Sequence, residues 1–192
     1  MEPSSVKTRH WTRVEYDRLV ETGFFQPDEK LELLGGDLVV REPQATPHAT
    51  AIRLIARALR AAFSPDWTVE AQLPVALDDE SEPEPDVTVV PGGPRDYLAS
   101  HPRRPGLIVE VAESSLAFDR EHKGSLYARA RVPDYWIVNL VDRVLEVYRE
   151  PAADPEAPFG WRYSALLRLG PADWVSPLAA PGARIPVADL LP

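Results

Sequence analysis

The sequence predicts an α/β (α+β) fold in which a mixed central sheet is flanked by helices. Two apolar runs, residues 86–91 and 106–112, are continuous, which is typical of strands covered on both faces. Two other segments, residues 48–63 and 117–131, repeat apolar side chains at helical spacing. These helices would supply the layers that cover the sheet.

The chain is long enough for one domain with a sizeable core. It has 192 residues, of which 44% are hydrophobic. We expect residues 1–10 to form a flexible N-terminal arm and residues 11–192 to form the domain. A Pro-rich tail from about residue 171 should wrap around it.

The composition excludes several classes of protein. The chain has no cysteine, which rules out disulfides, cysteine-based zinc sites and thiol nucleophiles. The first residues lack the apolar core of a signal peptide and no run approaches the length of a membrane span, so we expect a cytoplasmic protein with no membrane partner. The net charge of −9 argues against coating nucleic acid by bulk electrostatics, but it does not exclude a nuclease.

The N-terminal part of the domain should be a helix followed by a hairpin. Thr12 and Glu15 match a capping box, and Gly23 would close the helix that follows. Within residues 30–40, two short strands flank Gly35-Gly36, which indicates a hairpin.

The helix predicted at residues 48–63 has two different faces. Its apolar face comprises Ile52, Ile55, Leu59 and Phe63. A second face comprises Arg53, Arg57 and Arg60. The arginines form either a solvated face or a ridge that contacts phosphates.

Three strands should follow this helix. The first is expected at residues 67–77, before an acidic, proline-broken loop at residues 78–84 of a kind that is usually solvated. The apolar runs described above form the other two strands, and the loop between them contains Arg103 and Arg104.

The helix predicted at residues 117–131 carries a lysine on its apolar face. Leu126, Tyr127 and Ala130 define that face, and Lys123 shares it. Lys123 therefore either extends past the apolar surface to solvent or points into a cavity.

The C-terminal part should extend the sheet. Strands are predicted at residues 135–139 and 144–148, joined as a hairpin, and at residues 161–169 after a Pro-rich loop at 151–158. We predict a homodimer through the aromatic side chains of this region unless the tail covers them. These side chains are Tyr135, Trp136, Tyr148, Trp161 and Tyr163.

One carboxylate stands inside a strand that should be buried. Glu110 interrupts the apolar run that ends at Ala112, and an ionised carboxylate is unfavourable there unless a cation, a metal or a proton compensates it. Asp86 opens the neighbouring run, and Lys123 follows on the next helix. Two acids and a lysine in this arrangement indicate a metal-dependent phosphodiesterase.

The order of elements, αβββαβ, resembles the core of the PD-(D/E)XK nucleases. Pro85-Asp86 matches the proline and first acid of their motif, and Glu110 matches the second acid. The usual lysine two residues later is replaced by Ala112. Because residues 110 and 112 face the same side of a strand, Ala112 leaves room for Lys123 from the next helix, a migration known in the superfamily.

Further short motifs occur along most of the chain. They are Trp11-Thr12 with Tyr16, residues 32–38, Pro47-His48, residues 84–87, residues 109–112, Asp119, Lys123, Tyr127-Ala128 and residues 132–136. In this order and spacing they resemble the Uma-two family of bacterial restriction-endonuclease-like proteins. The resemblance implies a magnesium-dependent endonuclease that hydrolyses phosphodiester bonds of DNA.

The resemblance also implies roles for individual residues. Asp86 and Glu110 would hold Mg²⁺, or Mn²⁺ as a substitute, while Lys123 would orient the attacking water. Glu32 would position a water or a second ion. Substrate contacts are expected from His48, Arg53, Arg57, Arg103 and Arg104. Supporting roles are expected for Asp119 and Tyr127.

Structural roles are open for the same residues. Asp86 could cap a turn, Glu110 could pair with an arginine, and Glu32 could be an exposed hairpin residue. The remaining candidates, His48, Asp119 and Tyr127, could serve only the helices and the core.

Other functions are open as well. The missing strand lysine and the acidic composition also fit a nuclease-fold binding or regulatory module with weak or no catalysis. RNA or a branched junction could replace DNA as the substrate.

Overall fold

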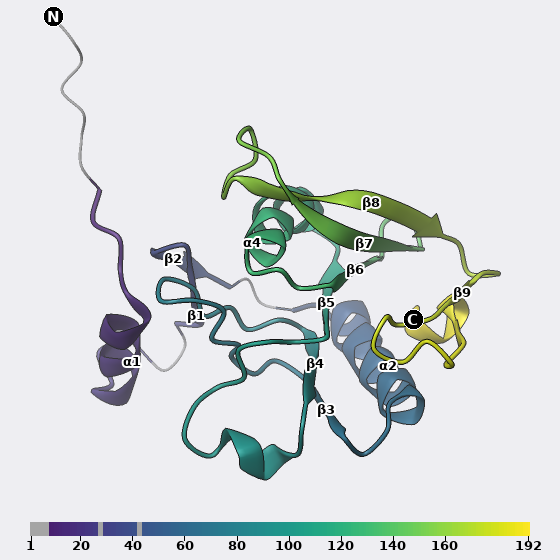
Figure 1. The fold of residues 1–192 in the computed structure, drawn as a ribbon, viewed down its shortest axis with the longest axis horizontal. Coiled ribbons are helices and arrows are strands. Elements are labelled where there is room, and N and C mark those ends of the chain that lie inside the picture. Colours follow the sequence, from purple (N-terminus) through teal and green to yellow (C-terminus); the bar gives the residue numbers. More distant parts are fainter. Residues whose placement is uncertain (1–7, 27–28, 42–43) are drawn as a thin grey trace, which may run out of the picture.

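The computed structural model describes residues 8–26, 29–41 and 44–192. Its centre is a six-stranded sheet with the order β3-β4-β5-β6-β7-β8. The β5–β6 pair is parallel and the other four pairs are antiparallel. Helices cover both faces of this sheet (Figure 1), so the predicted mixed sheet flanked by helices is confirmed.

The central strands are the most deeply buried elements. Nearly all residues of β4, β5 and β6 are buried, which explains why their sequences are continuously apolar. The six strands are β3 (Trp67–Glu70), β4 (Val87–Pro91), β5 (Leu107–Ala112), β6 (Asp134–Asn139), β7 (Val144–Ala153) and β8 (Trp161–Leu169).

Helix α2 (Thr46–Ala62) covers one face of the sheet. Its apolar side chains are buried against one face of the sheet, formed by alternate strand residues such as Val87 and Val109, because successive strand residues point to opposite faces. Burial of one such aliphatic side chain contributes about 1.5–3 kcal/mol. The arginine face of α2 is exposed: Arg53, Arg57 and Arg60.

A second helical layer covers the opposite face, where strand residues such as Ile108 and Ile137 pack with Tyr127. This layer contains a π-helical turn, in which the Gly124 N–H donates to the carbonyl of Asp119, five residues back. A regular helix was predicted here. The layer consists of α3 (Leu116–Phe118), the π-helical turn (Asp119–Lys123) and α4 (Gly124–Arg129).

The N-terminal helix and hairpin form as predicted. The capping box of Thr12 and Glu15 is present. Gly35 and Gly36 have φ of 60° and 89°, the left-handed conformation that a two-residue hairpin turn requires. The elements are α1 (Arg13–Glu21), β1 (Leu31–Leu34) and β2 (Asp37–Val40).

The strand predicted at residues 67–77 is too long. β3 ends at Glu70, because Gln72 has a positive φ of 55° and Pro74 has no N–H for a ladder. Residues 71–77 instead run as irregular chain beside the sheet.

The acidic loop at residues 78–84 is not solvated throughout. Ser81 and Glu82 are buried. The Glu82 N–H donates to the carbonyl of Leu33 at 2.7 Å, and the Arg13 guanidinium lies 3.7 Å from the Glu82 carboxylate. The loop therefore fixes the hairpin and α1 against the rest of the domain.

The C-terminal tail wraps around the domain as predicted. Val187 and Leu190 join the core beneath α2. The buried Asp134 carboxylate accepts from the Leu178 N–H at 2.9 Å and from Arg149 at 2.8 Å. The tail contains β9 (Trp174–Val175), β10 (Ile185–Pro186) and a 3₁₀ turn (Val187–Leu190).

The Pro-rich loop predicted at residues 151–158 is shorter than expected. Strand β7 continues through Pro151 to Ala153, where Pro151 is opposite Tyr163 of β8. The connection between the two strands therefore starts only at Asp154.

The predicted aromatic surface is wrong. Tyr135 and Trp136 are fully buried, and the rings of Tyr135, Tyr148 and Tyr163 pack on one another with centroids 5.6–6.2 Å apart. The Trp161 ring lies under the Arg131 guanidinium at 4.8 Å. Tyr148, Trp161 and Tyr163 are half-buried by contacts within the chain, and dimerisation stays a prediction without this support.

The predicted arm at residues 1–10 lies mostly outside the described residues. Residues 8–10 are exposed, and the Trp11 N–H then joins the chain to the hairpin by donating to the Gly36 carbonyl at 2.8 Å. Within the described part of the chain, no helix is both long enough and apolar enough to cross a bilayer.

Glu146 on β7 is a buried carboxylate with several donors. It accepts from Arg120 at 2.9 Å, from Arg168 at 2.9 Å, from Tyr148 at 2.7 Å and from Asn139 at 3.1 Å. Burial alone would raise the pKa of Glu146, but these hydrogen bonds lower it to about 2. A shift from 4.5 to about 2 corresponds to roughly 3 kcal/mol of stability.

We predict that Glu146→Gln lowers the free energy of unfolding by up to about 3 kcal/mol at neutral pH. Because the folded-state pKa is depressed, this stabilisation is complete above about pH 4.5 and is lost as the pH falls toward about 2. Urea unfolding of both proteins across this range measures it, with the exposed Glu156→Gln as the control. The same difference in stability at about pH 7 and about pH 3 would contradict the prediction.

Candidate active site

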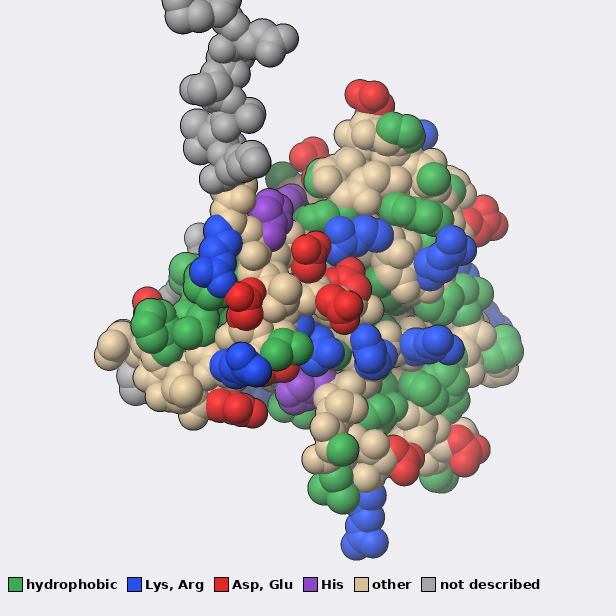
Figure 2. All heavy atoms as spheres, turned by 60° about the vertical axis from the view of Figure 1, so that its left-hand side comes forward, with side chains coloured by type: hydrophobic (Ala, Val, Ile, Leu, Met, Phe, Trp, Pro, Cys, Tyr) green, Lys and Arg blue, Asp and Glu red, His purple; other side chains and the backbone are tan. Residues whose placement is uncertain are grey.

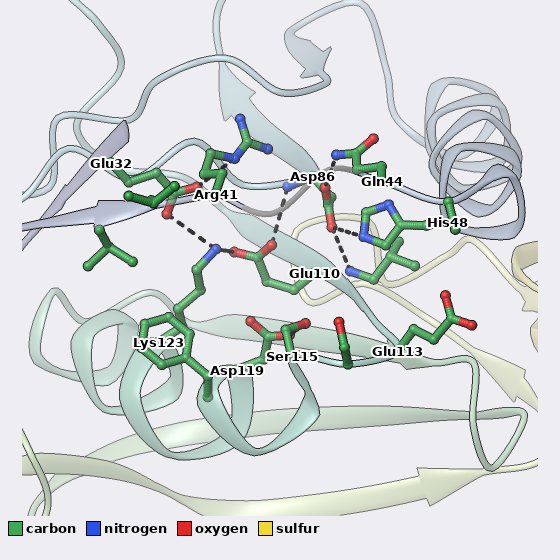
Figure 3. A pocket seen from close by; sticks show the side chains of 16 residues that line it. Glu32, Arg41, Gln44, His48, Asp86, Glu110, Glu113, Ser115, Asp119 and Lys123 are labelled. Carbon is green, nitrogen blue, oxygen red and sulfur yellow. Dashed lines mark hydrogen bonds and ion pairs between the residues drawn. The ribbon is translucent and has the colours of Figure 1, made fainter. Parts of the chain in front are cut away.

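Asp86, the residue just before β4, and Glu110, inside the adjacent antiparallel strand β5, lie next to each other. The register pairs Val87 with Val109, so its continuation places Asp86 opposite Glu110. The Val111 N–H donates to Asp86 Oδ2 at 2.9 Å and fixes that carboxylate. Both acids are buried and line one cavity of about 730 Å³ (Figure 3).

Lys123 points into the same cavity from the π-helical turn. Its ammonium lies 3.0 Å from Glu110 Oε1 and 3.4 Å from Glu32 Oε2 (Figure 3). Burial alone would lower the pKa of Lys123, but Glu110 and Glu32 raise it, so the side chain stays an ammonium ion. The predicted approach of Lys123 to Glu110 is therefore present.

Two further residues of the helical layer support this arrangement. Burial raises the pKa of the Tyr127 phenol well above its ordinary value, so the hydroxyl stays protonated and donates to Glu110 Oε1 at 2.6 Å. Asp119, also buried, accepts from the Ser115 hydroxyl at 2.6 Å. Burial raises the pKa of Asp119, while Lys123 lowers it.

Glu32 reaches the site from hairpin strand β1 and is not an exposed hairpin residue. It is 1% exposed. Arg41, just after β2, places its Nε 3.0 Å from Glu32 Oε1 and its Nη1 2.6 Å from Glu84 Oε2. Arg41 thus links the hairpin to the segment that leads into Asp86.

His48 stands in the first turns of α2 and contacts the same Asp86 oxygen that accepts from the Val111 N–H. Its Nε2 lies 3.2 Å from Asp86 Oδ2, and its Nδ1 has no partner among the described residues. Burial alone would lower the pKa of His48, but the Asp86 carboxylate raises it. Asp86 therefore stabilises the protonated form of this imidazole.

The cavity contains more negative than positive charge. Among the described residues, the acids that line it are Glu32, Asp86, Glu110, Glu113 and Asp119, against Arg41, Lys123 and the titratable His48. Burial raises the pKa of Glu110 even though Lys123 lowers it. Additional positive charge in this cavity would therefore be stabilised.

Asp86 and Glu110 each keep one oxygen that a cation could use. Among the described residues, Asp86 Oδ1 accepts only from the Gln44 amide at 3.4 Å, and Glu110 Oε2 only from the Asp86 N–H at 3.4 Å. No three His, Asp or Glu side chains in the described ranges already form a ligand set for a metal. The residues present fit a hard divalent ion bound by two carboxylates and water, since oxygen ligands suit such ions.

The structure does not bring every predicted site residue to the cavity. Arg53 and Arg57 lie on the exposed face of α2 and do not line it. Arg104 is exposed elsewhere, and Arg103 lies 3.9 Å from Asp79. Any contact of these arginines with substrate would have to be outside the cavity.

Several lining residues were missed by sequence reasoning. The hairpin register could have indicated Arg41. Glu32 is opposite Val39, and Arg41, the first residue after β2, falls on the same face as Val39 because alternate residues share a face. No sequence signal marked Gln44 or Phe118, which line the cavity from segments outside any strand.

Comparison with known proteins places the chain among nuclease-like proteins. The sequence matches the profile of Uma2, described as "Putative restriction endonuclease", over residues 13–188. No curated protein sequence matches the chain. The structure is similar to the crystal structure of a "putative nuclease belonging to DUF820" from Anabaena variabilis ATCC 29413, with a TM-score of 0.70 and 14% identity over 94% of this chain and 97% of that chain.

At this identity the structural likeness shows a shared fold. The family profile is a separate finding and spans nearly the whole described domain, from α1 to the 3₁₀ turn of the tail. The chain therefore belongs to the Uma2 family.

Proposed function

We propose that this protein is a metal-dependent endonuclease that hydrolyses phosphodiester bonds of DNA. The observation that carries the proposal is the buried pair Asp86, just before β4, and Glu110 of β5, in a cavity whose described lining has excess negative charge. Family membership supports a nuclease. Figure 2 shows lysine and arginine side chains in a row across one face, beside acidic ones, so positive charge is available for phosphates despite the net charge of −9.

Asp86 and Glu110 would hold the ion, Mg²⁺ or its substitute Mn²⁺. Such an ion polarises a phosphodiester oxygen and lowers the pKa of water, which supplies the nucleophile. The Val111 N–H keeps Asp86 in position for this role, and Tyr127 keeps Glu110 in position.

Lys123 would act on the phosphate itself. Its ammonium is already desolvated and borders the cavity, so it can stabilise negative charge that grows on a phosphate oxygen without reorganising. Glu32 holds the ammonium from the opposite side at 3.4 Å, and Arg41 in turn holds Glu32.

A second candidate function rests on a different observation. His48 lies against Asp86 and Lys123 against Glu110, so the two acids already have positive or titratable partners without an ion. A binding module with the nuclease fold would keep these pairs permanently. The following experiments distinguish the two functions.

We predict that Mg²⁺ or Mn²⁺ raises the melting temperature. At an ion concentration of 100 times Kd the stabilisation is about 2.7 kcal/mol, which is roughly 5–10 °C for a domain of this size. The rise should disappear in Asp86→Asn and persist in Glu121→Gln, whose exposed acid lies two residues before Lys123. An equal rise in wild type and Asp86→Asn would place the ion elsewhere.

We predict nicking of supercoiled plasmid DNA that requires Mg²⁺ or Mn²⁺. Glu110→Gln and Lys123→Met should each lower the rate by at least about 100-fold, because each removes charge that the reaction needs. Glu121→Gln should cut at the wild-type rate. Wild type that binds DNA but never cuts it, with either metal, would favour the binding module, and cleavage of only RNA or branched DNA would change the substrate.

We also predict opposite effects on stability in the absence of metal. Glu110→Gln should leave the free energy of unfolding unchanged or higher, because it relieves crowding of buried carboxylates. Lys123→Met should lower it by about 3 kcal/mol or more, because Glu110 and Glu32 lose their shared cation. Chemical denaturation in a chelator measures both, and a large loss in Glu110→Gln would identify a structural ion pair.

A further inference from the structure

Phe118 is an exposed aromatic residue at the edge of the acidic cavity. It is the last residue of α3 and directly precedes the π-helical turn that carries Asp119 and Lys123. Its side chain is 36% exposed and lines the same cavity as Asp86 and Glu110. The cavity therefore combines a charged floor with an aromatic rim.

The ring of Phe118 is held in place by a second ring. His122 stacks on it with centroids 4.9 Å apart and an interplanar angle of 19°. Phe159 then meets His122 edge-on at 4.8 Å and 68°. These three side chains form one aromatic stack, in which the Phe118 ring is the member that borders the cavity.

The base of the aromatic stack is anchored to the domain. The Phe159 N–H donates to the Ser125 hydroxyl at 2.9 Å, and the Arg129 guanidinium lies 4.8 Å from the Phe159 ring centre. A Cβ at Gly35 would collide with the Phe159 ring, so the hairpin turn packs directly against it. A fixed ring loses little conformational freedom when a ligand stacks on it.

The chemistry of the cavity suits a nucleotide at this ring. The π-face of a nucleobase stacks on aromatic side chains, and this contact tolerates any base. The volume of about 730 Å³ lies within the range of roughly 300–1,000 Å³ that small-molecule sites occupy. A nucleotide whose phosphate is at Asp86, Glu110 and Lys123 would therefore meet Phe118 with its base.

We propose that Phe118 stacks on an unpaired base next to the scissile phosphate, so that the protein prefers single-stranded DNA. This inference rests on the proposed nuclease function. A base inside a duplex has both faces covered by its neighbours and must be unstacked before it can reach the ring, whereas a single strand offers it at little cost. Phe118 is thus a positioning residue that determines the strand state of the substrate.

Binding in Ca²⁺ tests the proposal independently of cleavage. Fluorescence anisotropy compares labelled single-stranded and duplex DNA of the same sequence. Phe118→Leu removes the aromatic face while keeping an apolar side chain, and Phe118→Trp keeps an aromatic face. Phe24→Leu is the matched control, because Phe24 is 67% exposed and does not line the cavity.

Phe118→Leu should weaken binding of single-stranded DNA by roughly 5- to 150-fold, the range found when stacking on one base is lost. Its binding of duplex DNA should stay within about twofold of wild type. Phe118→Trp and Phe24→Leu should bind single strands as wild type does. A single abasic nucleotide can be placed at each position of the strand in turn. At one position it should weaken binding to wild type as much as Phe118→Leu does. At that position it should not weaken binding to Phe118→Leu any further.

A 2-aminopurine at that position gives a direct readout of stacking. Its fluorescence should fall on binding to wild type and to Phe118→Trp, but not on binding to Phe118→Leu. Unchanged binding by Phe118→Leu, or an equal loss for single strands and duplex, would overturn the inference. If wild type still nicks plasmid DNA, only the inference has failed; if wild type neither binds nor cuts any DNA, the proposed function has failed with it.

Discussion

The buried ammonium of Lys123 is the contact on which the site depends. It lies 3.0 Å from Glu110 on the central strand β5 and 3.4 Å from Glu32 on the hairpin. Without it, the buried Glu110 would have no cation among its described partners, a situation that typically costs several kcal/mol, roughly 3–5. One side chain therefore joins the sheet, the hairpin and the helical layer, and the position of each depends on the others.

The π-helical turn explains how this lysine reaches the sheet. The turn also carries Arg120, which binds the buried Glu146 of β7. Two cations of one turn thus contact acids of two different strands, Glu110 and Glu146, on the same face of the sheet. The wider turn brings the carbonyl of Asp119 close to Gly124, where a Cβ would lie only 3.3 Å from that oxygen, and glycine makes this approach possible. The helix geometry and the charged site are one structural feature.

The charge balance of the cavity gives the proposed chemistry its physical basis. Each of the two strand acids has one oxygen held by protein donors and one that accepts only a long hydrogen bond among the described residues. The held oxygens fix the geometry, and the others can bind a cation. Phe118 of the aromatic stack adds an uncharged part to the lining, so that phosphate and base of one nucleotide would meet different parts of the same cavity.

The sequence by itself determined the fold class, most element positions, and the placement of Asp86, Glu110 and Lys123 on neighbouring elements. Helical and strand periodicity indicate which side of each element faces the core. The family motifs along the chain indicated the order of the elements. Only the tertiary structure decided that Arg41 joins the site beside Glu32, that residues 81 and 82 are buried, and that Phe118 borders the cavity. Such contacts join segments that lie far apart along the chain, and the π-helical turn changes the angle at which side chains leave the helix. Periodicity within one segment carries no information about contacts between distant segments or about the position of a π-helical turn.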